Sequence, residues 1–159
     1  MTLINSQTLR SAAATVTFSS IPGTYRDLRL ILQTTVVSGA EDVTLRFNGD
    51  SGSNYSRVQI AGTGSTTSSG VASSVTFAQI DVQGAPITTV SSMHKVDILD
   101  YAQTDKHKTF LSRSDSASGG VDAMAHRWAS TSVVTSITLG TTGVNFNTGS
   151  TFYLYGIAG

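Results

Sequence analysis

The three histidines of this chain are the side chains with the widest range of possible chemistry. His94, His107 and His126 show no paired metal-binding spacing such as His-x-x-x-His, so the sequence does not indicate a zinc site. Asp105 with His107, and Asp122 with His126, could each orient an imidazole toward Ser112 or another hydroxyl, as a nucleophilic site requires. Ser and Thr make up more than a quarter of the chain, so such combinations also arise by chance. No Gly-x-Ser-x-Gly motif singles out one serine, and we predict no enzyme activity.

The turn-forming residues 48–54 are the second place in the sequence that could form a functional site, in this case a metal site. Asn48, Asp50 and Asn54 offer oxygen atoms, but calcium takes about six to eight oxygen ligands and this run has a single carboxylate. Asn and Gly also adopt positive φ, and Asp bonds its own backbone in turns. We therefore interpret Asn48, Gly49, Asp50 and Asn54 as a structural turn, and we predict no metal, no other cofactor and no catalytic residue.

Aromatic and imidazole side chains are the candidates for contact with a partner. Trp128, the only tryptophan, alternates in phase with His126, and Tyr101 and His107 lie near a polar turn. Because Trp and Tyr are enriched at interfaces, we name Tyr101, His107, His126 and Trp128 as partner-contact candidates. The alternative for Trp128 is a place in the core.

Composition narrows the class of protein. Ten basic and ten acidic residues cancel, so no long-range field favours nucleic acid, and no apolar run approaches the roughly 18 residues of a membrane span. The chain has no cysteine, and its start lacks the basic and apolar regions of a secretion signal. The 159 residues suit a single domain, with residues 1–12 as a possible N-terminal arm.

Elements that would position these residues are almost all strands. Residues 43–47 alternate strictly between apolar and polar, turn formers follow, and alternation resumes at 58–60. Similar segments predict about eight to ten short strands, typical of an antiparallel β-sandwich of jelly-roll type. Residues 62–74, rich in Gly, Ser and Thr, are predicted to be a mobile loop. The side chains predicted to point inward are Val16, Phe18, Leu28, Leu30, Leu32, Val43, Leu45, Phe47, Val96, Ile98, Ile137, Leu139 and Leu154.

Three segments together resemble a known group of proteins. Residues 18–28 (FSSIPGTYRDL), 47–55 (FNGDSGSNY) and 132–157, which end in GSTFYLYGI, are similar to small virion structural proteins of tailed bacteriophages, often phages of cyanobacteria and other aquatic bacteria. The resemblance covers most of the chain in the same order. It implies a β-rich module that is made in the host cytoplasm and located on the virion, and it supplies no catalytic residues.

The resemblance leaves several stations on the particle open. We predict a capsid decoration or cement protein that binds the major capsid protein and resists internal DNA pressure through many weak contacts. A homo-oligomer, with a trimer favoured, would suit threefold positions of the lattice. The alternative is a tail-tip or tail-fibre module that recognises host-surface glycan through Trp128, Tyr101 and loop hydroxyls. A third possibility is a tail-tube or connector subunit.

Overall fold

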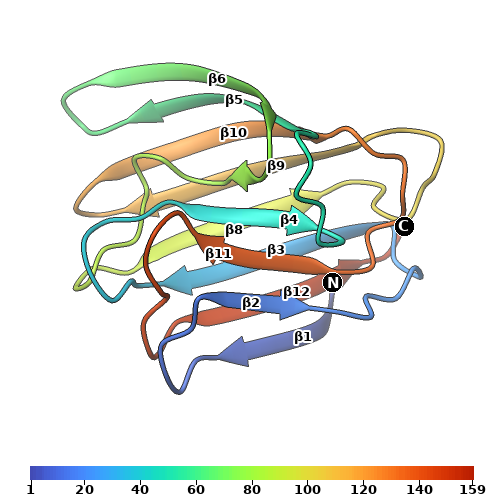
Figure 1. Ribbon diagram of the computed structural model, residues 1–159, viewed down its shortest axis with the longest axis horizontal. Helices are drawn as coiled ribbons and strands as arrows, with labels where there is room; N and C mark the ends of the chain where they lie inside the picture. The colour runs from blue at the N-terminus through green and yellow to red at the C-terminus, as the bar shows by residue number, and fades with distance from the viewer.

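The computed structural model describes residues 1–159 and contains twelve strands and no helix (Figure 1). Every strand pairing is antiparallel, and the strands form two sheets of very different size. The prediction of an all-β antiparallel sandwich is therefore confirmed, while the jelly-roll topology stays a prediction. No helix in the structure has the length and apolar character needed to cross a membrane.

Strands from both ends of the chain are interleaved in each sheet. The eight-stranded sheet has the order β1 (Thr2–Thr8), β12 (Thr151–Ile157), β3 (Asp27–Thr34), β8 (Ser92–Ile98), β9 (Lys108–Ser116), β10 (Gly120–Trp128), β5 (Tyr55–Gly62) and β6 (Thr67–Val75). The four-stranded sheet has the order β2 (Thr15–Phe18), β11 (Ile137–Thr141), β4 (Val43–Phe47) and β7 (Ala78–Gln79). The first and last strands, β1 and β12, are neighbours in the large sheet.

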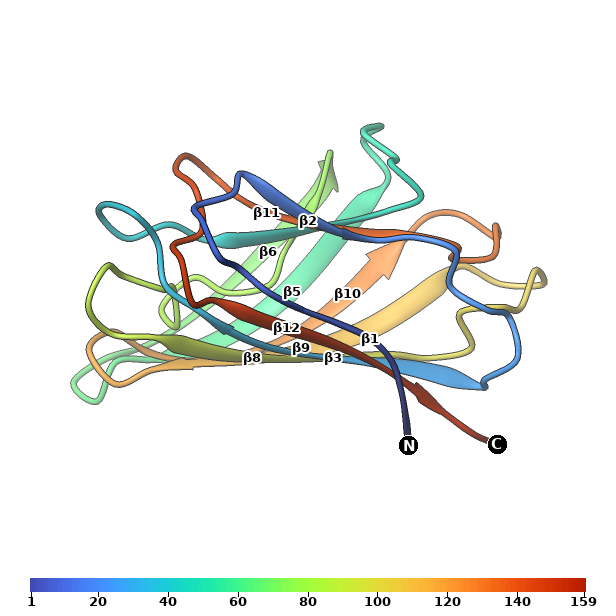
Figure 2. The same ribbon diagram turned by 90° about the horizontal axis from the view of Figure 1, so that it is seen from below.

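The core lies between the two sheets, which Figure 2 shows as separate layers. Each strand with alternating residues turns its apolar side chains inward, as the pleat of a half-buried strand requires. Phe47 of the small sheet packs on Phe110 and Trp128 of the large one, with ring centroids 5.1 and 5.4 Å apart. Every residue that the sequence predicts to point inward is buried, which confirms that part of the prediction.

Two segments differ from the sequence prediction. Most of the predicted loop at residues 62–74 belongs to β6, which pairs with β5 from Thr67 to Val75. Within the predicted arm, residues 2–8 form β1, which pairs with β12. Both strands lie at the edges of the large sheet and bury few side chains, so they carry no apolar alternation that would have predicted them.

One leucine-to-alanine substitution on an inner face of the sandwich and one on an outer face test which side chains point into the core and which point outward. Leu45→Ala removes a fully buried side chain from the core, so the free energy of unfolding should fall by about 2–5 kcal/mol. Leu111→Ala, on an exposed side chain, should change it by about 0.5 kcal/mol or less. Urea unfolding followed by Trp128 fluorescence measures both. Equal losses in the two variants would contradict the assignment of inner and outer faces.

Candidate functional site

A buried polar cluster occupies one end of the space between the sheets. The inner face of β9 changes along the strand from Phe110 to the serines Ser112, Ser114 and Ser116, all of them buried. His94, Asp122 and His126 join them from the neighbouring strands. The chain that leaves the small sheet after β7, residues 80–84, supplies the partners of several of these side chains.

Ser112 and His126 form the one hydrogen-bonded serine–histidine pair in this cluster. The Ser112 Oγ lies 2.8 Å from His126 Nε2, but the residues are only 1% and 4% exposed. The other ring nitrogen, Nδ1, has no hydrogen-bond partner, so no carboxylate orients the imidazole. Burial, followed by the nearby positive charge of Arg57, lowers the pKa of His126 to about 3. The imidazole is therefore neutral, a weak base, and shielded from any substrate in this conformation.

Asp122, which the sequence placed beside His126, serves a different purpose. Its Oδ2 accepts hydrogen bonds from the backbone N–H groups of Val82, Gln83 and Gly84, at 3.0, 2.9 and 2.7 Å, and from the Ser114 hydroxyl at 3.0 Å. Three successive N–H groups around one carboxylate oxygen form an anion-binding nest. Gly84 is required here, since a Cβ would lie 2.6 Å from the Ser114 Oγ. Asp122 thus fixes this segment against β9 and β10.

A second buried carboxylate connects the same segment to both sheets. Asp81 Oδ2 lies 2.5 Å from His94 Nε2 of β8, and its Oδ1 accepts a hydrogen bond from the Val43 N–H of β4 at 2.7 Å. The side chains of Asp81 and His94 are completely buried. The pKa of Asp81 is raised because burial is the larger effect, and the adjacent His94 opposes part of the increase. These contacts tie the edge of the small sheet to the centre of the large one.

Three of the four partner-contact candidates are internal, so that prediction is wrong for their side chains in this fold. Trp128 and His126 belong to the inward phase of β10, and Tyr101 is fully buried, with its hydroxyl donating to the Pro22 carbonyl. His107 alone is exposed, and its Nδ1 accepts a hydrogen bond from Arg127 Nε at 3.1 Å. The structure does not bring the four residues together into one surface.

The turn residues have the geometry that the structural interpretation requires. Asn48 and Gly49 have φ of 53° and 69°, and the Asn48 amide oxygen accepts hydrogen bonds from backbone N–H groups of residues 135 and 136. Asp50 accepts from the Gly52 N–H, from the Asn54 amide and from the indole N–H of Trp128, at 2.8, 2.9 and 2.6 Å. The hydrogen bond from Trp128 is the main cause of the lowered pKa of Asp50. Both carboxylate oxygens are therefore occupied within the protein.

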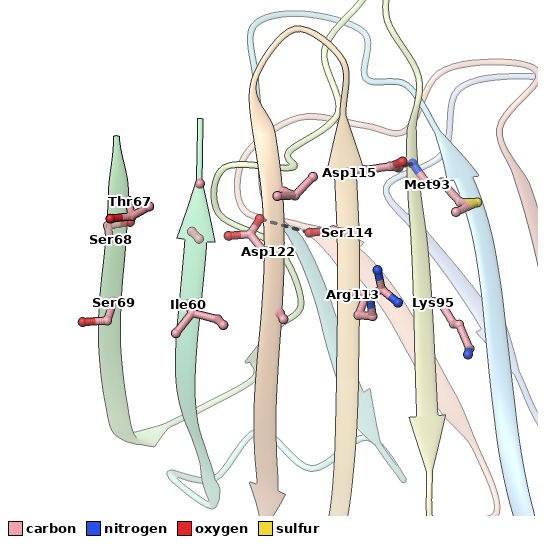
Figure 3. Close-up of a pocket in the computed structure, with 14 residues that line it drawn as sticks. Ile60, Thr67, Ser68, Ser69, Met93, Lys95, Arg113, Ser114, Asp115 and Asp122 are labelled. Carbon is pink, nitrogen blue, oxygen red and sulfur yellow. Dashed lines mark hydrogen bonds between the residues drawn. The ribbon is translucent and has the colours of Figure 1, made fainter. Parts of the chain in front are cut away.

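The outer face of the large sheet carries the main exposed apolar surface. We define the outer patch as Val58, Ile60, Val71, Leu111, Val121, Ala123 and Ala125, from strands β6, β5, β10 and β9. Its five larger side chains are 54–77% exposed. Their strand register makes the patch continuous: Val71 lies opposite Val58, which in turn lies opposite Ala125. A shallow groove of about 880 Å³ crosses part of this patch (Figure 3).

Charged side chains border the outer patch on one side. Arg113 of β9 and Lys95 of β8 lie directly opposite one another, and Figure 3 shows both at the groove, on adjacent strands. Lys95 contacts Asp97 at 3.3 Å, and Asp97 also pairs with Arg29 at 2.5 Å. Arg113 has no ion-pair partner. Asp115 of β9 also lines the groove and accepts a hydrogen bond from the Met93 N–H at 3.1 Å, so this border carries side chains of both signs, and Arg113 is the cation left to pair with an acidic group.

The order of residues in β10 contains a signal for the outer patch. Val121, Ala123 and Ala125 alternate with Met124, His126 and Trp128, so one of the two phases of this strand had to face outward. Choosing the phase requires the neighbouring strands, because Val58 and Leu111 lie on the same face only after β10 has paired with β5 and β9.

No group of three or more His, Cys, Asp or Glu side chains is arranged to hold a metal ion.

Acid should weaken the fold through His126. In the unfolded chain this imidazole gains a proton near pH 6.5, whereas the folded protein does not protonate it until about pH 3, so stability is lost as the pH falls between those values. From pH 7 to pH 4.5 the wild type should lose about 2–3 kcal/mol more than His126→Gln. Urea unfolding across this range measures the difference. A difference that does not change with pH would show that His126 titrates normally in the folded state.

Comparisons with known proteins add no assignment. A scan against protein-family models, a search of curated proteins and a search of solved structures each returned no match. Two features of the chain itself therefore bear on its function. One is a buried polar cluster that a substrate does not reach, and the other is an exposed apolar patch beside the side chains of Arg113 and Lys95.

Proposed function

We propose that this chain is a structural protein of a bacteriophage virion, and specifically a capsid decoration protein that binds the major capsid lattice through its outer patch. The observation that carries the proposal is the concentration of large aliphatic side chains on one exposed sheet face. Soluble monomers rarely expose continuous apolar patches of this kind except where they bind a partner. The resemblance of residues 18–28, 47–55 and 132–157 to phage virion proteins supplies the class of partner.

The chemistry of the outer patch describes the surface that fits it. Val58, Ile60 and Val121 give a broad, flat apolar contact, and Arg113, which has no ion-pair partner, lies at one border. A complementary capsid surface would present apolar side chains with an acidic residue positioned at Arg113. Many copies of such a modest contact, spread over the head, would stabilise the shell through multivalency.

A binding role agrees with the location of the reactive side chains. Ser112, His126 and Asp122 are inside the sandwich, where they hold strands and the segment 80–84 together. They contribute to rigidity, and the flat, hydroxyl-rich exterior offers no enclosed site that contains them. We therefore propose a structural protein and not an enzyme, located on the virion.

The glycan-binding alternative loses its two aromatic residues and retains only loop hydroxyls. Trp128 and Tyr101 were the aromatic platforms for a sugar ring, and both are at most 2% exposed. A tail or fibre position stays compatible with the outer patch as a protein contact, so the experiment below also tests the position on the particle.

Binding to phage heads tests the proposal with a matched pair of charge substitutions. Ile60→Asp places a carboxylate in the outer patch, and Thr17→Asp places one on the exposed face of the small sheet. Purified variants are mixed with heads of the parent phage that lack this protein, and bound protein is measured by co-sedimentation. Ile60→Asp should weaken binding at least about tenfold, since a central apolar contact contributes about 2 kcal/mol, while Thr17→Asp binds like the wild type.

Urea unfolding of both variants shows that any loss is not caused by misfolding. Saturation of the heads at a fixed number of copies supports decoration. Wild-type protein that binds host cells or isolated tails but not heads would contradict it, and so would an Ile60→Asp variant that binds heads as tightly as Thr17→Asp.

A further inference from the structure

The free edge of β6 is the longest unprotected strand edge of the molecule. β6 spans nine residues, pairs only with β5, and forms the end of the eight-stranded sheet, with no element beyond it in Figure 1. Natural proteins protect such edges with charges, prolines or bulges. Residues 58–80 contain no charged residue and no proline, so the edge has none of the first two protections.

The register of the β5–β6 hairpin identifies which backbone groups face outward. Thr63 N–H donates to the Thr66 carbonyl at 3.0 Å and closes the hairpin, so hydrogen-bonded pairs alternate along the ladder from that point. Thr67, Ser69 and Val71 therefore direct their N–H and C=O groups away from β5, toward solvent. This stretch is regular, because the irregularity in the pairing lies beyond Ala72.

We propose that the β6 edge pairs antiparallel with the β6 edge of a second copy of this chain, around a two-fold axis at Ser69. In this register Thr67 lies opposite Val71 of the second copy, and their backbone groups continue the ladder. A copy of itself suits the edge because residues 58–80, which include all of β6, are uncharged and introduce no repulsion between identical edges. The small side chains Ser69 and Gly70 also leave the backbone open to a neighbouring strand.

The opposite edge of the sheet is less suited to the same contact. β1 has a register shift between Leu3 and Asn5, and a bulge of this kind interrupts the regular spacing that a neighbouring strand needs. One self-complementary edge closes after two copies. The inferred assembly is therefore a dimer, in place of the trimer that the capsid lattice suggested.

The dimer would enlarge the surface that we propose binds the capsid. The pairing of the two β6 edges does not rest on the proposed capsid binding. A two-fold axis perpendicular to the sheet places the outer faces of both copies on the same side. Val71, the most exposed member of the outer patch, lies on β6 itself, so the two patches become neighbours across the axis. Two linked patches bind a repeating lattice more tightly than one.

Sedimentation equilibrium of the purified chain between about 1 and 100 μM tests the pairing. The wild type should have twice the 16.6 kDa mass of one chain. Ser69→Lys places two like charges opposite one another at the axis and should shift the dimer to monomer, with a dissociation constant raised at least tenfold. Ser65→Lys adds the same charge at the hairpin tip, beyond the paired residues 67–71 and with no like charge facing it, and should sediment as the wild type does.

Cysteine substitutions give a second, position-specific readout, because the natural chain has no cysteine. Facing residues of a hydrogen-bonded antiparallel pair have Cα atoms about 5.5 Å apart, which a disulfide can span. Under mild oxidation Ser69→Cys should form a covalent dimer, and Ser65→Cys should stay largely monomeric. A wild type that is monomeric at 100 μM or trimeric, a Ser69→Lys variant that associates as tightly as Ser65→Lys, or equal cross-linking at the two positions would overturn the proposal.

Discussion

The hydrogen bonds around Asp122 and Asp81 are the constraint on which the rest of this structure depends. Eight strands face four, so the small sheet alone does not supply partners for the polar inner residues of β8, β9 and β10. The segment 80–84 supplies them, with three N–H groups on Asp122 and the Asp81 carboxylate on His94. An unsatisfied buried donor or acceptor costs about 1–3 kcal/mol, so a sandwich of this shape needs such a segment.

The same constraint determines where the reactive side chains lie. Ser112, His126 and Asp122, the combination that could form a nucleophilic site, instead hold strands and the segment 80–84 together, and their burial keeps them from solvent. The outward phase of β10 is aliphatic from Val121 to Ala125. β10 shows both roles: His126 and Trp128 point into the sandwich, and Val121 and Ala125 belong to the outer patch. A rigid interior with one apolar patch on its outer face suits a protein that binds a partner.

The sequence predicted the core well because alternation is a local signal. Residues 28–32 and 43–47 carry their inward and outward faces in their own order of residues, and the turn at Asn48 and Gly49 follows from the φ values those residues tolerate. β6 was not predicted, since an edge strand of Ser, Gly and Thr is held mainly by backbone hydrogen bonds to β5. The direction of Trp128 was not predicted either, because it depends on which face of β10 meets the small sheet. The contacts of Asp122 join residues about forty positions apart, which no local pattern encodes.

An electron cryomicroscopy image of intact particles carrying this protein, labelled at its C-terminus, tests the central claim most directly. For a capsid decoration protein we expect density at regular positions on the head. The outer face of the eight-stranded sheet should lie against the shell, and the four-stranded sheet should face outward. Density confined to the tail, or density on the head with the four-stranded sheet against the shell, would contradict it.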